Sequence, residues 1–261
     1  MRRLILIVGA TELVLFVATR IIIAHMSPWE WQTELLRTGC RALAALVLWH
    51  FFRDIIFSGA PVKRGTGHPL LLLALAILFA VPLLVGNLAQ GPFTKVVFAS
   101  AAIVVGIHEE FLFRGIIQTL IERRLGTLRA IVITSAVMTV WHVGVVYPHF
   151  FSFWQVFTIS CMLGLIFAAT QSIWLVVVLH AVYDAIWSAT PVLAVPLAYH
   201  WGALLLLVAL VLTWLWVRST CWPNPAVQGT LRDKAGECPE FCVQGGLKFH
   251  CLLVDFTPRV S

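Results

Sequence analysis

Two adjacent carboxylates and an arginine interrupt a long apolar stretch near the middle of the chain. Glu109 and Glu110 follow Gly106-Ile107-His108, and Arg114 stands four residues after Glu110. In a bilayer, a charged side chain at a helix centre costs about 2.5 to 3.5 kcal/mol on insertion scales, so such a group indicates a functional site. On a helix Glu110 and Arg114 can pair, while Glu109 points about 100° away. The pattern predicts one carboxylate held in a bracing ion pair and one that can act as a catalytic base.

Two later apolar stretches carry further polar groups. His142 ends the sequence Met138-Thr139-Val140-Trp141-His142, and His180 and Asp184 are i,i+4 neighbours on one helix face. Considered alone, each histidine could serve packing as well as catalysis. Considered alone, the Glu-Glu-Arg cluster could be a polar contact between helices. Separate unsatisfied polar groups would cost several kcal/mol each in a bilayer, so we expect these groups to converge on one hydrated site.

Composition assigns the chain to the membrane proteins. Of its 261 residues 60% are hydrophobic and 11% are charged, with a mean hydropathy of +0.93, whereas about 25% are charged in soluble domains. The net charge of +6 is modest. Because no basic stripe with interleaved stacking aromatics accompanies it, we expect no nucleic-acid partner.

The apolar stretches predict an all-α, polytopic transmembrane helix bundle of about eight spans, at about 20 residues per crossing. We divide it into N-terminal transmembrane helices (1–93), a core that holds the polar groups (94–190), a last transmembrane helix (191–217) and a tail (218–261). The sixth, seventh and eighth stretches are closely joined, so a re-entrant element is an alternative there. The eight stretches are 4–24, 38–57, 69–89, 94–121, 129–147, 153–169, 172–190 and 192–217.

The basic residues predict the topology. The positive-inside rule places both termini in the cytoplasm, because most lysines and arginines then fall on that side and few, Arg37 and Lys95 among them, on the other. We expect the tail to be cytoplasmic and disordered, and the first stretch to be an uncleaved span. The residues on the cytoplasmic side are Arg2, Arg3, Arg53, Lys63, Arg64, Arg123, Arg124, Arg129 and Arg218.

The sequence lacks the motifs of several other classes of intramembrane protease. A zincin requires His-Glu-x-x-His, but Leu112 stands where the second histidine would be. An aspartyl dyad requires a second membrane aspartate that shares a proton with Asp184, and we find none. A serine nucleophile requires an elbow such as Gly-x-Ser, which no span contains. The remaining set is a glutamate, two histidines and a carboxylate. It can activate water directly or through a bound metal.

These motifs, in this order and each in its own apolar stretch, resemble the CPBP family of intramembrane endopeptidases over about residues 95–190. The family includes CaaX prenyl endopeptidases and bacterial proteins tied to bacteriocin processing and self-immunity. The resemblance implies that Glu109 is the general base and polarises the attacking water together with His142. Glu110 and Arg114 would brace the helix. His180 and Asp184 would stabilise the oxyanion, or Asp184 would hold the tautomer of His180.

The chain departs from the family pattern at two positions. Met138 stands where phenylalanine is common, and Asp184 stands where many members have asparagine. An ionised aspartate cannot donate to an oxyanion, so either Asp184 is protonated or it only orients His180.

The resemblance leaves the cofactor open. The site works without a metal, or Glu109, His142 and His180 hold a divalent ion such as zinc. We favour the metal-free alternative, because no His-x-x-x-His pair lies nearby.

The resulting hypothesis is an intramembrane protease in a bacterial inner membrane that cleaves a membrane-associated or lipidated peptide. It predicts a polar cavity between the fourth, fifth and seventh helices, through which water enters. A non-catalytic immunity or partner-binding protein, or a proton-coupled carrier, are the alternatives. We expect His108, Glu12 and Arg41 to serve packing, snorkelling or interhelical pairing, and we expect no zinc site at Cys238, Cys242, His250 and Cys251.

Overall fold

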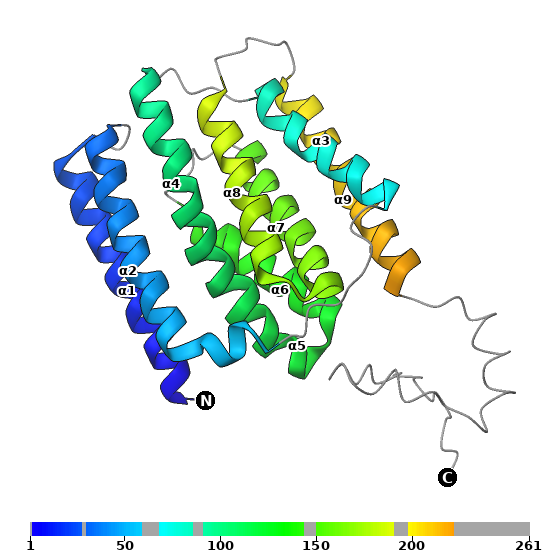
Figure 1. Ribbon diagram of the computed structural model, residues 1–261, viewed down its shortest axis with the longest axis horizontal. Helices are drawn as coiled ribbons and strands as arrows, with labels where there is room; N and C mark the ends of the chain where they lie inside the picture. Colours follow the sequence, from blue (N-terminus) through cyan, green and yellow to red (C-terminus); the bar gives the residue numbers. More distant parts are fainter. Residues whose placement is uncertain are drawn as a thin grey trace, which may run out of the picture. The chain divides into compact units, whose positions relative to one another are not determined.

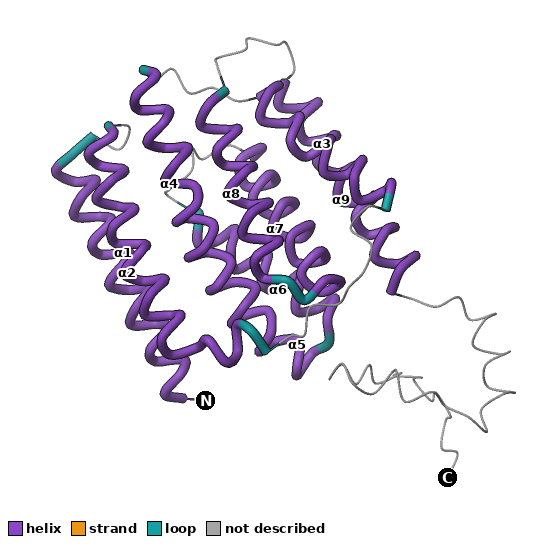
Figure 2. Tube along the Cα trace, in the orientation of Figure 1, coloured by secondary structure: helices purple, strands orange, loops and turns teal. Residues whose placement is uncertain are grey.

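The computed structural model describes residues 2–27, 30–58, 68–85, 91–143, 150–190 and 198–221. These residues form helices joined by turns (Figure 2), so the predicted all-α bundle is confirmed. The chain separates into two units, Met1–Trp222 and Pro223–Ser261. The second unit, and with it the predicted disorder of the tail and its cysteines, lies outside the described residues.

Eight continuous helical runs follow one another in the described part of the chain. Five of them are long and apolar enough to cross a membrane, and α3, α6 and α8 are shorter apolar helices. The runs are α1 (Arg2–His25), α2 (Trp31–Ile56), α3 (Pro69–Val85), a run of α4 (Pro92–Glu110), the π-helical segment η1 (Phe111–Gln118) and α5 (Thr119–Leu125), then α6 (Thr127–Trp141), α7 (Phe150–Thr170), α8 (Ile173–Ala189) and α9 (Ala198–Cys221).

Most of the predicted boundaries agree with these helices to within four residues, and three differ. The fifth helix ends at Trp141 rather than at 147. The second helix begins at Trp31 rather than at 38, because Glu34 neutralises the arginines of its first turns and lets them lie within the helix. The last helix begins at Ala198 rather than at 192 and ends at Cys221. α8 and α9 are regular helices, so the described residues there contain no re-entrant turn.

Helix α4 organises the packing around the predicted polar groups. It packs against α8 on one side and α2 on another, and α1 packs against α2 (Figure 1). α3 and α7 pack on α9, and α6 packs on α7. Glutamates at the end of α4 therefore face different neighbours according to their helical phase.

Gly106 permits the close approach of α4 and α8. A Cβ atom at this position would lie 3.1 Å from the carbonyl oxygen of Val177 and 3.4 Å from the backbone nitrogen of Ala181. The neighbouring atoms belong to the α8 backbone, which cannot rotate away as a flexible side chain can. The glycine thus sets the distance at which the next turn of α4 meets the polar face of α8.

Candidate active site

The two glutamates lie where the α-helix changes to a π-helix. α4 ends at Glu110, and η1 begins with the next residue. Such π-helical turns interrupt α-helices mostly at functional sites. Both carboxylates are buried, Glu109 with 5% of its surface exposed and Glu110 with none.

Glu110 points into the protein and pairs with Arg114, as predicted from their spacing. The Nε atom of Arg114 lies 3.2 Å from Oε2 of Glu110, and neither side chain is exposed. The guanidinium also donates from Nη2 to the Ser160 hydroxyl on α7 at 3.0 Å. The ion pair therefore ties η1 to α7 as well as bracing its own helix.

His180 is oriented by Glu110. Its Nδ1 atom lies 2.7 Å from Oε1 of Glu110. An ionised carboxylate only accepts hydrogen bonds, so Nδ1 carries a proton and donates it. The other ring nitrogen, Nε2, faces Glu109 Oε2 at 3.8 Å and Asp184 Oδ2 at 3.4 Å. The orienting partner suggested by the sequence was Asp184, but Asp184 contacts the opposite nitrogen and its side chain is 35% exposed.

His142 is held in the same manner by the backbone. It lies just past the end of α6 rather than within a span that continues to 147, and its Nδ1 atom lies 2.8 Å from the carbonyl oxygen of Met138. A carbonyl can only accept, so Nδ1 is again the donor. The Nε2 atom then faces Oε2 of Glu109 at 3.8 Å.

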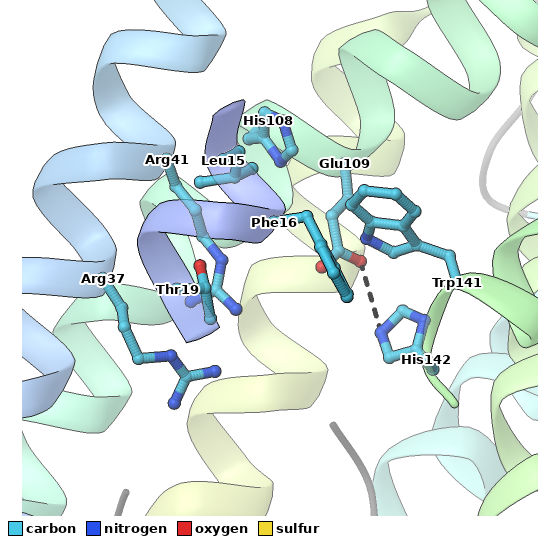
Figure 3. Close-up of a pocket in the computed structure, with 9 residues that line it drawn as sticks. All are labelled: Leu15, Phe16, Thr19, Arg37, Arg41, His108, Glu109, Trp141 and His142. Atoms are coloured by element: carbon cyan, nitrogen blue, oxygen red, sulfur yellow. Dashed lines mark ion pairs between the residues drawn. The ribbon is translucent and has the colours of Figure 1, made fainter. Parts of the chain in front are cut away.

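These orientations converge on Oε2 of Glu109. The atom is buried, has no hydrogen-bond partner, and lies 3.8 Å from one nitrogen of each histidine. These separations are too long for direct hydrogen bonds, and polar groups at such distances are commonly bridged by water. Figure 3 shows Glu109 and His142 facing each other across this gap. The arrangement can hold a water molecule between a carboxylate and an imidazole.

Comparison with known families finds a match over the segment that carries these polar groups. A family model described as "Type II CAAX prenyl endopeptidase Rce1-like" matches residues 91–186. This segment contains Glu109, Glu110, Arg114, His142, His180 and Asp184. This match supports the resemblance of the segment to the CPBP family of CAAX proteases. No curated protein and no solved structure matches the chain. The match to this family model implies protease activity.

A pocket opens beside Glu109, and its walls coincide only in part with those of the predicted cavity. It is bounded by α1, α2, the end of α4 and the end of α6, rather than by α4, α6 and α8. His180 is absent from its lining, and the Nδ1 atom of its ring contacts Glu110. The lining residues, drawn in Figure 3, are Leu15, Phe16, Thr19, Arg37, Arg41, His108, Glu109, Trp141 and His142.

The first two helices, outside the CPBP match, supply charged groups that sequence reasoning did not assign to the site. Glu12 of α1 lies 3.0 Å from Nε2 of His108, and both are buried. Interhelical pairing was among the interpretations expected for Glu12, but its contact with His108 was not predicted. Arg37 and Arg41 line the pocket, and Arg37 lies within α2 rather than in a loop. The spacing of Glu34, Arg37 and Arg41 on one helix face was the sequence feature that could have revealed them.

The side chains around Glu109 are of the types that bind zinc, but their positions do not form a zinc site. Two imidazoles with engaged Nδ1–H groups and a carboxylate are common zinc ligands. However, in the described part of the chain no three histidine, cysteine, aspartate or glutamate side chains are arranged so that they could hold a metal ion. The residues as placed do not fit a metal, and we derive no step through one.

Proposed function

We propose that this protein is an intramembrane endopeptidase in which Glu109 activates a water molecule to hydrolyse a peptide bond. The substrate would be a membrane-associated or lipidated peptide. The observation that carries the proposal is the buried Oε2 of Glu109, which has no hydrogen-bond partner and which two histidines approach with their Nε2 atoms.

The first chemical step is attack by water. Glu109 takes a proton from the water held between Oε2 and Nε2 of His142, and the water oxygen forms a bond to the carbonyl carbon of the substrate. The carbonyl π electrons move to oxygen, which becomes an oxyanion. Positioned proton transfer of this kind contributes about 100- to 10,000-fold to a rate.

The second step is collapse of the tetrahedral intermediate. The carbon–nitrogen bond breaks as Glu109 returns its proton to the leaving amine, so the carboxylate is regenerated. His180 lies between the carboxylates of Glu110 and Asp184, and an imidazolium there would be charge-balanced and would donate Nε2–H to the oxyanion. Glu110 and Arg114 position this histidine and do not contact the substrate.

The experiment that tests the proposal is cleavage of reporter peptides in membranes. Wild type and Glu109→Gln would be co-expressed with a panel of membrane-anchored and prenylated reporters, in bacterial cells whose inner membrane we propose as the protein's location. We expect wild type to cut at least one reporter and Glu109→Gln to cut none. Glu30→Gln, at an exposed glutamate that precedes α2, is the matched control and should cut like wild type.

A chelator arm addresses the metal alternative. A mechanism that uses only the chain's own residues predicts that the purified protein keeps its activity after exhaustive chelation. Loss of cleavage on chelation, restored by zinc, would instead make Glu109, His142 and His180 metal ligands. Equal cleavage by wild type and Glu109→Gln would contradict the proposal in either form.

A further inference from the structure

A second carboxylate–imidazole pair lies beside Glu109, and the hydrolytic steps above do not use it. Oε1 of Glu12 on α1 lies 3.0 Å from Nε2 of His108, the residue before Glu109 on α4. Glu12 is 7% exposed and His108 is 1% exposed. His108 lines the pocket together with Glu109 (Figure 3). α1 lies outside the segment that matches the family model, so the match assigns Glu12 no role.

Packing alone does not account for this pair. Among the described residues of α1, Glu12 and Leu15 are the buried ones, and their i,i+3 spacing places them on one helix face. A buried carboxylate or imidazole is costly unless its polar atoms are hydrogen-bonded. However, Nδ1 of His108 and Oε2 of Glu12 have no hydrogen-bond partner among the described residues. One ring nitrogen of His108 therefore remains available at the pocket.

Glu12 sets the tautomer of His108. An ionised carboxylate only accepts hydrogen bonds, so Nε2 of His108 carries the proton and donates it to Glu12. A neutral imidazole in this tautomer keeps its lone pair on Nδ1, which becomes a hydrogen-bond acceptor. The corresponding free nitrogens of His142 and His180 are their Nε2 atoms, and these face Glu109. His108 thus offers the pocket an acceptor that the base does not occupy.

A peptide in this pocket needs such an acceptor. Each residue of a substrate backbone brings one N–H and one C=O group, and a buried N–H without a partner costs free energy. The two arginines and the tryptophan of the lining can only donate, so they cannot serve an N–H group. Glu109 and His142 hold the attacking water in the proposed mechanism. The uncharged acceptors left in the lining are Nδ1 of His108 and the Thr19 hydroxyl, and Glu12 fixes the first of these.

We propose that Nδ1 of His108, oriented by Glu12, accepts a hydrogen bond from a backbone N–H group of the peptide substrate close to the scissile bond. The inference rests on the proposed function and adds a substrate-binding residue and a positioning residue to it. Because His108 directly precedes the base on α4, the hydrogen bond holds the peptide backbone near the carbonyl group that water attacks. α1 thereby contributes to substrate binding through Glu12.

The test removes single N–H donors from the substrate. In a set of farnesylated peptides, one amide at a time on either side of the scissile bond is replaced by an ester, which has oxygen in place of the N–H group. The purified full chain would be reconstituted in phosphatidylcholine vesicles, and kcat/KM for the scissile bond measured on the parent peptide and on each ester. We expect wild type to cleave one ester about 10- to 100-fold less efficiently than the parent, as for a buried acceptor left unpaired.

Variants of the pocket identify the acceptor. His108→Phe keeps a planar ring without nitrogen, so it should cleave the parent and that ester with efficiencies within about threefold of each other. The double variant Glu12→Leu/His108→Phe also removes the carboxylate that would otherwise stay buried without its partner, and it should give the same ratio. Thr19→Val removes the other uncharged acceptor and should keep the wild-type ratio. Each ratio is taken on one preparation, so it does not depend on the fraction of a variant that folds.

A separate measurement tests the positioning role of Glu12. NMR of the ring nitrogens in histidine-labelled protein distinguishes a protonated from an unprotonated nitrogen, and the signals of His108 are those missing from His108→Phe. We expect Nε2 to be protonated and Nδ1 unprotonated in wild type. Glu12→Leu should lose the preference for this tautomer and, with it, most of the discrimination against the ester. Glu30→Gln, at the exposed glutamate before α2, should change neither.

Three results would overturn the inference. One is a parent-to-ester ratio near one at every position in wild type, and another is a wild-type ratio that survives His108→Phe, which would show that the pair only holds α1 in place. The third is a protonated Nδ1 of His108 in wild type. Failure of the proposed function gives a different result, because Glu109→Gln would then cut the parent peptide at the wild-type rate.

Discussion

At the scale of single residues, the site depends on two neighbouring carboxylates that face different surroundings. Glu110 contacts Arg114 and His180, whereas Oε2 of Glu109 has no hydrogen-bond partner. Spacing alone predicted the Glu110–Arg114 pair, because i,i+4 neighbours meet on a helix. Spacing could not reveal that Glu110 also orients His180, since that contact joins residues 70 positions apart.

Replacing Glu110 should lower the stability of the folded protein, because Glu110 compensates a buried charge. Glu110→Gln removes the carboxylate beside the fully buried Arg114, and an uncompensated buried charge costs about 3 to 5 kcal/mol. At about 2 to 4 °C per kcal/mol, the thermal unfolding midpoint in detergent should fall by roughly 6 to 20 °C. Glu109→Gln, which breaks no hydrogen bond of Oε2, should leave the midpoint nearly unchanged. Equal midpoints for the two variants would contradict these roles.

At the scale of elements, the contact between α4 and α8 brings Glu110 to His180. The order and approximate extent of the helices could be predicted from apolar run lengths, because hydropathy decides which segments enter a bilayer. Helix ends depend on local pairing instead, as the early start of α2 at Trp31 and its Glu34–Arg37 ion pair show. The π-helical turn after Glu110 was not predictable, since its residues have the same apolar composition as an ordinary helix.

Crowding the α4–α8 contact should therefore impair the site. Gly106→Val places a Cβ about 3.1 Å from the Val177 carbonyl and adds two methyl groups, which pushes α8 and its histidine away. We expect cleavage activity to fall at least about tenfold, since small misplacements of reacting groups are costly. Gly9→Val on α1, where a Cβ would meet nothing within 4 Å, is the matched control. Equal activity of the two variants would show that the contact does not position His180.

At the scale of the whole molecule, the segment that carries the motifs does not enclose the pocket by itself. The predicted cavity was placed among the motif-bearing helices, but α1 and α2 form one wall of the pocket. The spacing of Glu34, Arg37 and Arg41 could have indicated this role for α2, whereas a residue such as Phe16 on α1 is of a type that also occurs at lipid contacts. In the described helices, the N-terminal end of α1 and the C-terminal end of α9 point the same way (Figure 1).

Because these two helix ends point the same way, we predict that the N-terminal end of α1 and the C-terminal end of α9 both face the cytoplasm. Arg123, Arg124 and Arg218 lie at that end of their helices, in agreement with the positive-inside rule. Green fluorescent protein fused before residue 1 or after residue 221 should fluoresce in bacterial cells, and alkaline phosphatase at the same sites should be inactive. Active phosphatase at either end would contradict the orientation.

The most direct test of the central claim is the turnover of Glu109→Gln on a farnesylated peptide with the purified, reconstituted protein. If Glu109 is the base that activates water, kcat should fall by about 100- to 10,000-fold, while KM and the thermal unfolding midpoint stay close to those of wild type. A variant that folds, binds the peptide and still cleaves it at the wild-type rate would show that Glu109 is not the base.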